Sequence, residues 1–282
     1  MKRKIFLSAL PLILLLMTGL AASARADQLP LWEAGLGATV LNFPDYRGSD
    51  ERQTWVLPFP YLVYRGEFLQ ADERRMRGLF FKTDRLELDV SANGSVPVDS
   101  GENSARRGMP DLDATLEIGP ALNVLLASTP GDRTRLELRM PVRAVLASDF
   151  SYVRQVGWVF QPHLNADIQD PAGLRGWKLG LLGGPLYTDR RYNRYFYAVD
   201  SAFATATRPA YSTGGGYGGM QFIAALSKRY QNFWVGGFLK WDQLNGAAFE
   251  ESPLVRDKRS FAGGIAIAWI LGKSKTLVEA PR

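Results

Sequence analysis

Apolar and polar residues alternate along most of this chain. The clearest stretch is 85–96, where one face holds Leu86, Leu88, Val90, Ala92, Gly94 and Val96. The opposite face holds Glu87, Asp89, Ser91, Asn93 and Ser95. A repeat of two residues places successive side chains on opposite faces of a strand, whereas a helix would repeat every 3.6 residues. The pattern therefore predicts strands with one apolar face and one polar face.

The alternating stretches predict twelve strands. They fall at 32–41, 54–64, 67–73, 76–82, 85–96, 114–126, 133–146, 157–169, 176–187, 215–229, 232–243 and 258–271. Antiparallel strands with apolar outer faces are typical of an all-β transmembrane barrel. The strands at 67–73 and 76–82 are charged around 72–77 and are joined by a brief turn, so ten strands is the alternative count.

Short and long connections alternate between the predicted strands. Tight turns such as 65–66, 82–85 and 230–232 separate long connections at 42–53, 97–113, 148–156, 188–214 and 244–257. Outer-membrane barrels have short periplasmic turns, long extracellular loops and an even number of strands. We therefore expect both chain ends in the periplasm and the long loops outside the cell, with the protein integral to a Gram-negative outer membrane.

Two residue types test the barrel prediction. All seven tryptophans fall inside predicted strands, most of them near a strand end, as an aromatic girdle requires. Proline has no amide hydrogen for a ladder bond, yet six prolines also fall there: Pro58, Pro60, Pro120, Pro141, Pro162 and Pro185. A closed sheet has no free edge, so we expect β-bulges at these prolines.

The first 26 residues differ from the rest. Lys2, Arg3 and Lys4 precede an apolar run at 5–17, and Ala24-Arg25-Ala26 follows. This predicts a secretory signal peptide cleaved between Ala26 and Asp27. Residues 27–282 then form one barrel domain with a short tail at 272–282. The net charge of +6 falls to about +2 without the basic residues of the leader, so the charge does not indicate nucleic-acid binding.

The segment 133–146 carries a row of charges on one face, formed by Arg133, Arg135, Glu137, Arg139 and Arg143. An arginine at the bilayer midplane costs about 2–4 kcal/mol, so we expect this row to line the lumen. Folding the preceding strand back across 128–132 sets Glu117 opposite Arg143 and Asn123 opposite Glu137. A lumen crossed by such ion pairs is plugged.

The sequence offers little for catalysis. His163 is the single histidine, and no serine lies two residues away on its face, as a serine–histidine pair on one strand would need. The chain has no cysteine, which leaves carboxylates as the main metal ligands available. We predict no enzyme activity, no metal site and no cofactor.

The connection 188–214 mixes basic and aromatic residues: Arg190, Arg191, Tyr192, Arg194, Tyr195, Phe196 and Tyr197. Such a mixture is enriched at binding surfaces. Aromatic residues at this density are also costly to leave in water. Surface binding and inward packing are both open interpretations of this loop.

Several motifs indicate a family. Pro44-Asp45-Tyr46-Arg47-Gly48-Ser49-Asp50 and the segment 58–66 resemble the N-terminal signature of the MipA/OmpV outer-membrane proteins. Gly184-Pro185-Leu186-Tyr187, Arg208-Pro209-Ala210-Tyr211, 244–248 and 252–255 agree with it. The resemblance implies a non-enzymatic scaffold that links a lytic murein transglycosylase to a murein synthase and contacts outer-membrane lipid and the barrel-assembly machinery. Outer-membrane barrels usually end on an aromatic residue of the last strand, so the tail after 261–271 departs from that pattern.

Two other functions remain alternatives. The loops 97–113 and 188–214 offer the area for a surface-binding or adhesion barrel. The inward arginines of 133–143 would instead favour anions if the lumen were a narrow pore.

Overall fold

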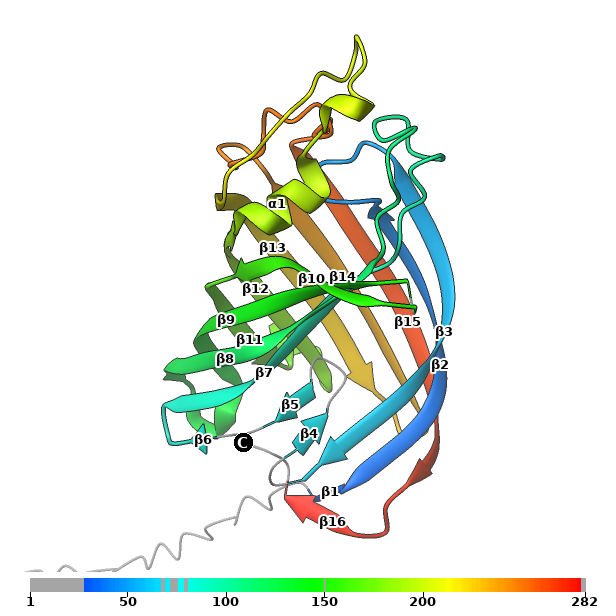
Figure 1. Ribbon diagram of the computed structural model, residues 1–282. Helices are drawn as coiled ribbons and strands as arrows, with labels where there is room; N and C mark the ends of the chain where they lie inside the picture. The colour runs from blue at the N-terminus through cyan, green and yellow to red at the C-terminus, as the bar shows by residue number, and fades with distance from the viewer. Residues whose placement is uncertain (1–27, 67–68, 72–75, 79–80, 150, 280–282) are drawn as a thin grey trace, which may run out of the picture.

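Long antiparallel strands dominate the computed structural model, which describes residues 28–279 except 67–68, 72–75, 79–80 and 150 (Figure 1). The long strands are β2 (Trp32–Pro44), β3 (Arg52–Arg65), β7 (Leu86–Ser95), β8 (Ala114–Ser128), β9 (Thr134–Ser148), β10 (Val153–Phe160), β11 (His163–Gln169), β12 (Trp177–Thr188), β13 (Gly216–Arg229), β14 (Phe233–Gln243) and β15 (Arg259–Lys273). Neighbours in the chain pair with one another, and β15 pairs back onto β2. The predicted transmembrane β-barrel is confirmed.

Shorter elements complete the architecture. They are β1 (Gln28–Pro30), β4 (Leu69–Ala71), β5 (Met76–Gly78), β6 (Phe81–Lys82), β16 (Leu277–Glu279), the helix α1 (Arg190–Tyr197) and the 3₁₀ turns η1 (Pro130–Asp132), η2 (Pro171–Gly173) and η3 (Ser201–Phe203). In the described residues no helix is long and apolar enough to cross a membrane. The predicted signal cleavage at Ala26 and Asp27 lies outside the described residues.

The strand count depends on one region of the wall. β10 and β11 both pair with β9 and with β12, so they are two halves of one strand. The described chain then contains ten full-length strands. The charged strands predicted at 67–73 and 76–82 are represented by β4, β5 and β6, with intervening residues outside the described part. Because β4 pairs with β3 and β5 lies against β7, these short strands link the two edges of the sheet.

The outer surface of the strands is apolar. On β3, the exposed Val56 and Leu62 alternate with the buried Tyr61 and Val63. Phe222, Trp241 and Phe261 form an aromatic row across three strands, with ring centroids 5.4 and 6.5 Å apart. Trp234 instead packs on the buried Tyr61, so not every tryptophan belongs to an outer girdle. A continuous apolar outer face suits hydrocarbon.

The prolines are accommodated in three ways. Next to Pro185 the pairing of β12 with β13 shifts register, which is the expected bulge. Pro162 lies in the break between β10 and β11. The β8–β9 ladder omits residues 119–120, so Pro120 sits where no pairing with β9 is made.

Pro58 and Pro60 contradict the bulge prediction, because the pairing of β3 with β2 has no register shift. The Arg65 amide donates to the Leu31 carbonyl, on the β2 side of β3. Amides point to alternate sides along a strand, so Pro58 and Pro60 face the other edge. In the described residues β4 pairs with β3 only at Tyr64 and Arg65. The two prolines therefore face an edge of β3 where no amide is needed.

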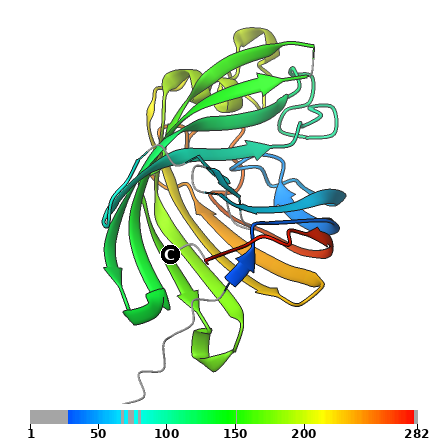
Figure 2. The same cartoon turned by 90° about the horizontal axis from the view of Figure 1, so that it is seen from below.

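The chain ends and the long loops lie at opposite ends of the barrel (Figure 1). β1 pairs with β16, so the residues before β2 and the tail after β15 form a two-stranded ribbon. Seen from below, this ribbon extends from the rim across part of the barrel opening (Figure 2). With long loops outside the cell, the ribbon lies on the periplasmic side.

Candidate functional site

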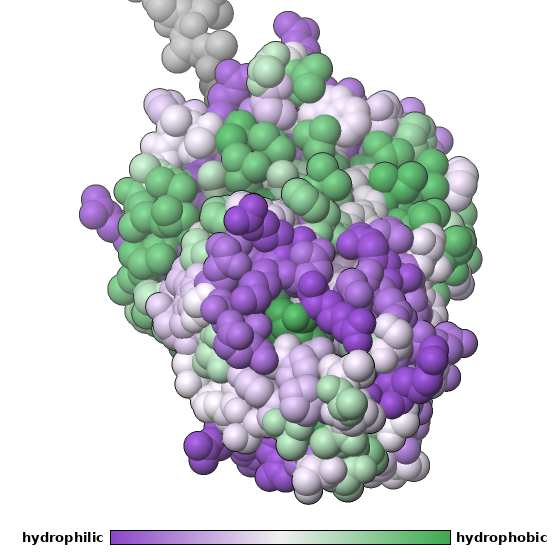
Figure 3. Space-filling model, turned by 90° about the horizontal axis from the view of Figure 1, so that it is seen from above, coloured by the Kyte–Doolittle hydropathy of each residue, from purple (hydrophilic) through white to green (hydrophobic). Residues whose placement is uncertain are grey.

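The long loops pack together and cap the extracellular mouth of the barrel. Their buried apolar side chains form one cluster that includes Tyr46, Val98, Leu112, Tyr192, Phe196, Tyr197, Val199, Leu244, Phe249 and Leu254. Tyr197 and Phe249 stack face to face at its centre, with ring centroids 3.7 Å apart. From the extracellular side the mouth is a hollow with a hydrophilic rim and a hydrophobic floor (Figure 3). We call the cluster of buried loop side chains the cap.

Hydrogen bonds between loops fix the cap. The Tyr46 hydroxyl donates to the Leu254 carbonyl at 2.8 Å, and the Ser252 hydroxyl donates to the Tyr197 carbonyl at 2.7 Å. The Tyr197 hydroxyl donates to the Arg47 carbonyl at 3.0 Å. Each bond joins segments far apart in sequence, so the loops form one packed layer.

The helix α1 gives the loop 188–214 one face that packs inward and one face that is exposed. The Asp189 side chain caps its N-terminus by accepting from the Tyr192 amide. Tyr192, Phe196 and Tyr197 are buried in the cap, about one helical turn apart. The arginines of the other face, Arg190, Arg191 and Arg194, are exposed.

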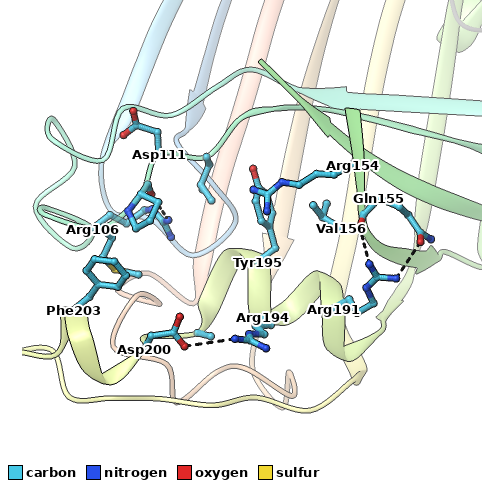
Figure 4. A pocket seen from close by; sticks show the side chains of 14 residues that line it. Arg106, Asp111, Arg154, Gln155, Val156, Arg191, Arg194, Tyr195, Asp200 and Phe203 are labelled. Atoms are coloured by element: carbon cyan, nitrogen blue, oxygen red, sulfur yellow. Dashed lines mark hydrogen bonds and ion pairs between the residues drawn. The ribbon is translucent and has the colours of Figure 1, made fainter. Parts of the chain in front are cut away.

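The exposed side of α1 borders a pocket of about 530 Å³ (Figure 4). Its walls come from the loop 97–113, the start of β10, and the segment 191–203. The Arg191 guanidinium donates to the Gln155 carbonyl at 3.1 Å and to the Gln155 side-chain oxygen at 3.3 Å. Arg154 lies over the Tyr195 ring, 5.2 Å from its centroid. We call this the arginine pocket.

Arg106 forms one side of the arginine pocket and is itself buried. Its guanidinium donates to the carbonyls of Phe196 and Pro110 and to the Ser100 hydroxyl. Burial lowers the pKa of Arg106. Burial and the nearby Asp113 carboxylate raise the pKa of the Tyr195 hydroxyl to about 12, so the tyrosine is neutral at physiological pH.

The structure places most of the predicted charge row inside the lumen. Arg143 pairs with Glu117 at 2.8 Å, although Glu117 lies opposite Val145 in the ladder and Asn123 lies opposite Arg139. The predicted register was therefore wrong by two residues, because the turn lies further along the chain than expected and sets Ser128 opposite Arg135.

Glu137 bridges two arginines of its own strand, at 2.5 Å from Arg135 and 2.6 Å from Arg139. Arg139 also lies 3.4 Å from Asp167 on β11. Arg133 is not part of this layer, because its side chain is 69% exposed and pairs with Asp170 between two turns. These lumen charges neutralise one another.

A second cavity, of about 510 Å³, lies between the cap and the lumen charges. Arg47 reaches down from the first loop and pairs with Asp242 at 2.8 Å. From Asp242 a chain of side-chain hydrogen bonds runs through Gln221 and Gln161 to Arg143. No local pattern indicated Arg47, Gln221 or Asp242, since Arg47 comes from the first loop while Gln221 and Asp242 lie opposite each other on the adjacent strands β13 and β14.

His163 is a buried lumen residue, and its Nδ1 lies 2.7 Å from the Gln161 carbonyl oxygen. In the described residues no group of three histidine, aspartate or glutamate side chains is arranged to hold a metal.

The periplasmic rim has its own ion cluster, which the sequence analysis also missed. Glu33 is fully buried between Arg65 at 2.9 Å and Arg229 at 2.7 Å. Arg65 also donates to the Pro30 carbonyl at 2.7 Å. The cluster therefore ties the β1–β16 ribbon to the barrel wall.

Comparison with known proteins gives one family and several distant folds. The family model of the MltA-interacting protein MipA matches residues 36–271. No curated protein matches the chain.

Among solved structures, an outer membrane channel from Pseudomonas putida F1 is 12% identical, with 88% of this chain and 98% of that chain covered and a TM-score of 0.38. The toluene transporter TbuX of Ralstonia pickettii is 9% identical, with 88% and 71% covered and a TM-score of 0.24. The family model covers nearly all the barrel that the structure shows, and the chain therefore belongs to the MipA family of integral outer-membrane β-barrel proteins.

Proposed function

We propose that this protein is a non-enzymatic, non-conducting outer-membrane anchor that holds murein-remodelling enzymes at its periplasmic rim. The observation that carries the proposal is the cap. A buried apolar layer, with Tyr197 and Phe249 stacked at its centre, fills the mouth through which solutes would pass. Paired charges also occupy the lumen beneath it. This arrangement favours an anchor over a narrow pore.

The periplasmic ribbon supplies a surface for docking. β1 and β16 stand outside the barrel sheet, and Leu277 on the ribbon is 52% exposed. Short periplasmic turns present little area, whereas a two-stranded ribbon presents both side chains and strand edges. The tail 272–282, which departs from the usual barrel ending, thus has a role in this proposal.

The partner class comes from the family. The family's namesake is described as an MltA-interacting protein. For this chain we propose a lytic murein transglycosylase as the partner, with a murein synthase joined to it.

Crosslinking pull-down tests the docking. The full chain, carrying a photo-crosslinker at Val278 on the ribbon, is expected to capture the transglycosylase from envelopes. Leu277→Glu places a charge on the ribbon and should lower the yield at least fivefold. Leu174→Glu is the matched control, because Leu174 is 51% exposed beside the periplasmic turn η2. Equal loss in both variants, or no capture by the unmodified ribbon, would overturn the docking proposal.

Planar-bilayer recording tests the closed lumen separately. The full chain should give no ionic current. A steady current through the unmodified protein would restore the pore as the better hypothesis.

A further inference from the structure

The arginine pocket lies at the opposite end of the molecule from the proposed docking ribbon, and that function makes no use of it. Its volume of about 530 Å³ falls within the range of about 300–1,000 Å³ that small-molecule sites occupy. Three chain segments build it (Figure 4), and each contributes a side chain to the cap: Leu112, Val156 and Phe196. The pocket is therefore a preformed feature of the extracellular surface.

Two arginines of the pocket, Arg191 and Arg106, donate hydrogen bonds to uncharged groups. Arg191 is bound to two oxygens of Gln155, and Arg106 is bound to two carbonyls and a serine hydroxyl. Within the described part of the chain, neither guanidinium has a carboxylate at salt-bridge distance. Both charges are held in place; Asp111, which also lines the pocket, acts electrostatically on Arg106, whereas Arg191 has no carboxylate partner within the described residues.

The other two arginines are weakly compensated. Arg194 lies 3.9 Å from Asp200, and both side chains are well exposed. Arg154 lies 3.4 Å from Asp113 and is also stacked on Tyr195. Pairs this long on a protein surface contribute little, so an incoming anion can replace either carboxylate at small cost.

The lining also holds two aspartates, Asp111 and Asp200, against four arginines, so it keeps an excess of positive charge, and most of its remaining side chains are apolar. Met109, Leu112, Val156 and Phe203 line the same pocket as the arginines. A hydrated inorganic ion would leave this surface unused, whereas an anion attached to an apolar body would cover it. Guanidinium groups bind phosphate and carboxylate oxygens through paired N–H donors.

We infer that the arginine pocket binds a phosphate or carboxylate group carried on a partly apolar ligand. Arg191 and Arg194 contact the anion, and Phe203 with Met109 contacts the apolar part. A phosphorylated glycolipid of the outer leaflet and a soluble phosphate ester share this chemistry, and the experiment below separates them.

Titration calorimetry on the full chain in neutral detergent tests the site. Phenyl phosphate is the soluble probe, phenol is its uncharged counterpart, and vesicles containing lipid A are the membrane probe. We expect phenyl phosphate or the vesicles to bind, phenol not to bind, and affinity to fall as salt is raised. Binding of phenyl phosphate indicates a soluble ligand, and binding of the vesicles alone indicates the glycolipid.

The variants decide whether the binding belongs to this pocket. Arg191→Gln/Arg194→Gln should lower affinity at least tenfold, since each charge-assisted bond is worth about that factor. Arg190→Gln removes the same charge from the neighbouring position of α1, outside the pocket lining, and should change affinity less than twofold. Arg191→Lys/Arg194→Lys keeps the charge and should recover part of the affinity.

Heat-modifiable gel mobility shows whether each variant still forms the barrel. The inference is overturned if no probe binds, if phenol binds as well as phenyl phosphate, or if Arg190→Gln weakens binding as much as the double variant. None of these outcomes bears on the periplasmic pull-down, so the two proposals stand or fall separately.

Discussion

The extracellular cap and the lumen beneath it are stabilised by different interactions. The cap buries aromatic and aliphatic side chains, and its hydrogen bonds run largely to backbone carbonyls. The lumen layer is held by ion pairs such as Arg143 with Glu117 and Glu137 with two arginines. The difference follows from the surroundings, because loops outside the bilayer can bury apolar residues in one another. Inward-facing residues of a membrane strand alternate with the lipid-facing apolar ones and are therefore polar.

The comparison assigns separate roles to the two layers. In the proposed function the cap closes the mouth, whereas the ion pairs link side chains that face the lumen. Each role can be tested by changing one layer and leaving the other intact.

Removing the main piece of the cap should have the largest effect. Deletion of residues 189–212 takes out α1 and with it Tyr192, Phe196 and Tyr197. We expect the silent barrel to become conducting in planar bilayers, since the apolar layer no longer fills the mouth. If the deleted protein keeps heat-modifiable mobility and still passes no current, the lumen side chains, not the cap, close the barrel.

Substitution of a single cap residue should have a smaller effect that is still measurable. Phe249 is fully buried and stacks on Tyr197, so Phe249→Ala leaves a cavity and should destabilise the loops by about 3–5 kcal/mol. Limited proteolysis of the extracellular loops in lipid vesicles would measure this as faster cleavage. Phe261→Ala, on the exposed outer face, is the control and should leave loop cleavage unchanged.

Removing one charge of the Arg143–Glu117 pair should destabilise the barrel more than removing both. Arg143→Met leaves Glu117 without its partner in a nearly buried position and should lower the free energy of unfolding by about 3 kcal/mol. Arg143→Met/Glu117→Leu removes both charges and should recover most of that loss. Urea unfolding in vesicles measures both, and a double variant as unstable as the single one would mean that the pair does more than neutralise itself.

The smallest effect should come from an exposed tether between two loops. Glu51 accepts a hydrogen bond from the Ser104 amide at 2.8 Å, and hydrogen bonding with the Ser104 side chain and with this amide lowers the pKa of the carboxyl below its ordinary value of 4.5. A lowered pKa means that the tether stabilises the loops above pH 4.5 and loses its contribution as pH falls through the folded-state value.

Glu51→Gln should remove that pH dependence and change the stability of the loops by at most about 0.5 kcal/mol, because the group is exposed. Loop proteolysis between pH 3 and pH 7 compares the two proteins. An unchanged pH profile in the variant would show that another carboxylate is responsible.

The sequence predicted the strands well because the bilayer imposes a strict alternation on them. The segments expected at 54–64 and 232–243 are found at Arg52–Arg65 and Phe233–Gln243. The sequence was less informative at the prolines, since nothing local shows whether the backbone nitrogen of a proline points toward a neighbouring strand or toward an edge. It also missed the Glu33 cluster, because Arg229 lies almost two hundred residues away in the chain.

For the loop residues, the sequence identified the residue types but not which side chains are buried and which are exposed. The mixture of arginine and tyrosine at 190–197 was visible, yet its two faces depend on the helical repeat of α1, which places Tyr192 and Tyr197 inward and the arginines outward. Gln155 at the start of β10 and Arg106 in the loop 97–113 complete the arginine pocket, and neither carried a signal of its own.

By itself the sequence determined the barrel, the alternation of its faces, the gathering of its long loops at one end and the family it resembles. These follow from connection length and from local periodicity. The surroundings of each strand face impose that periodicity residue by residue. The tertiary structure alone decided that the mouth is capped, that the lumen charges pair, that the two ends of the chain form a ribbon and that the arginines meet in one pocket. Each of these depends on contacts between segments distant in sequence, whose free energy exists only once the barrel has brought them together.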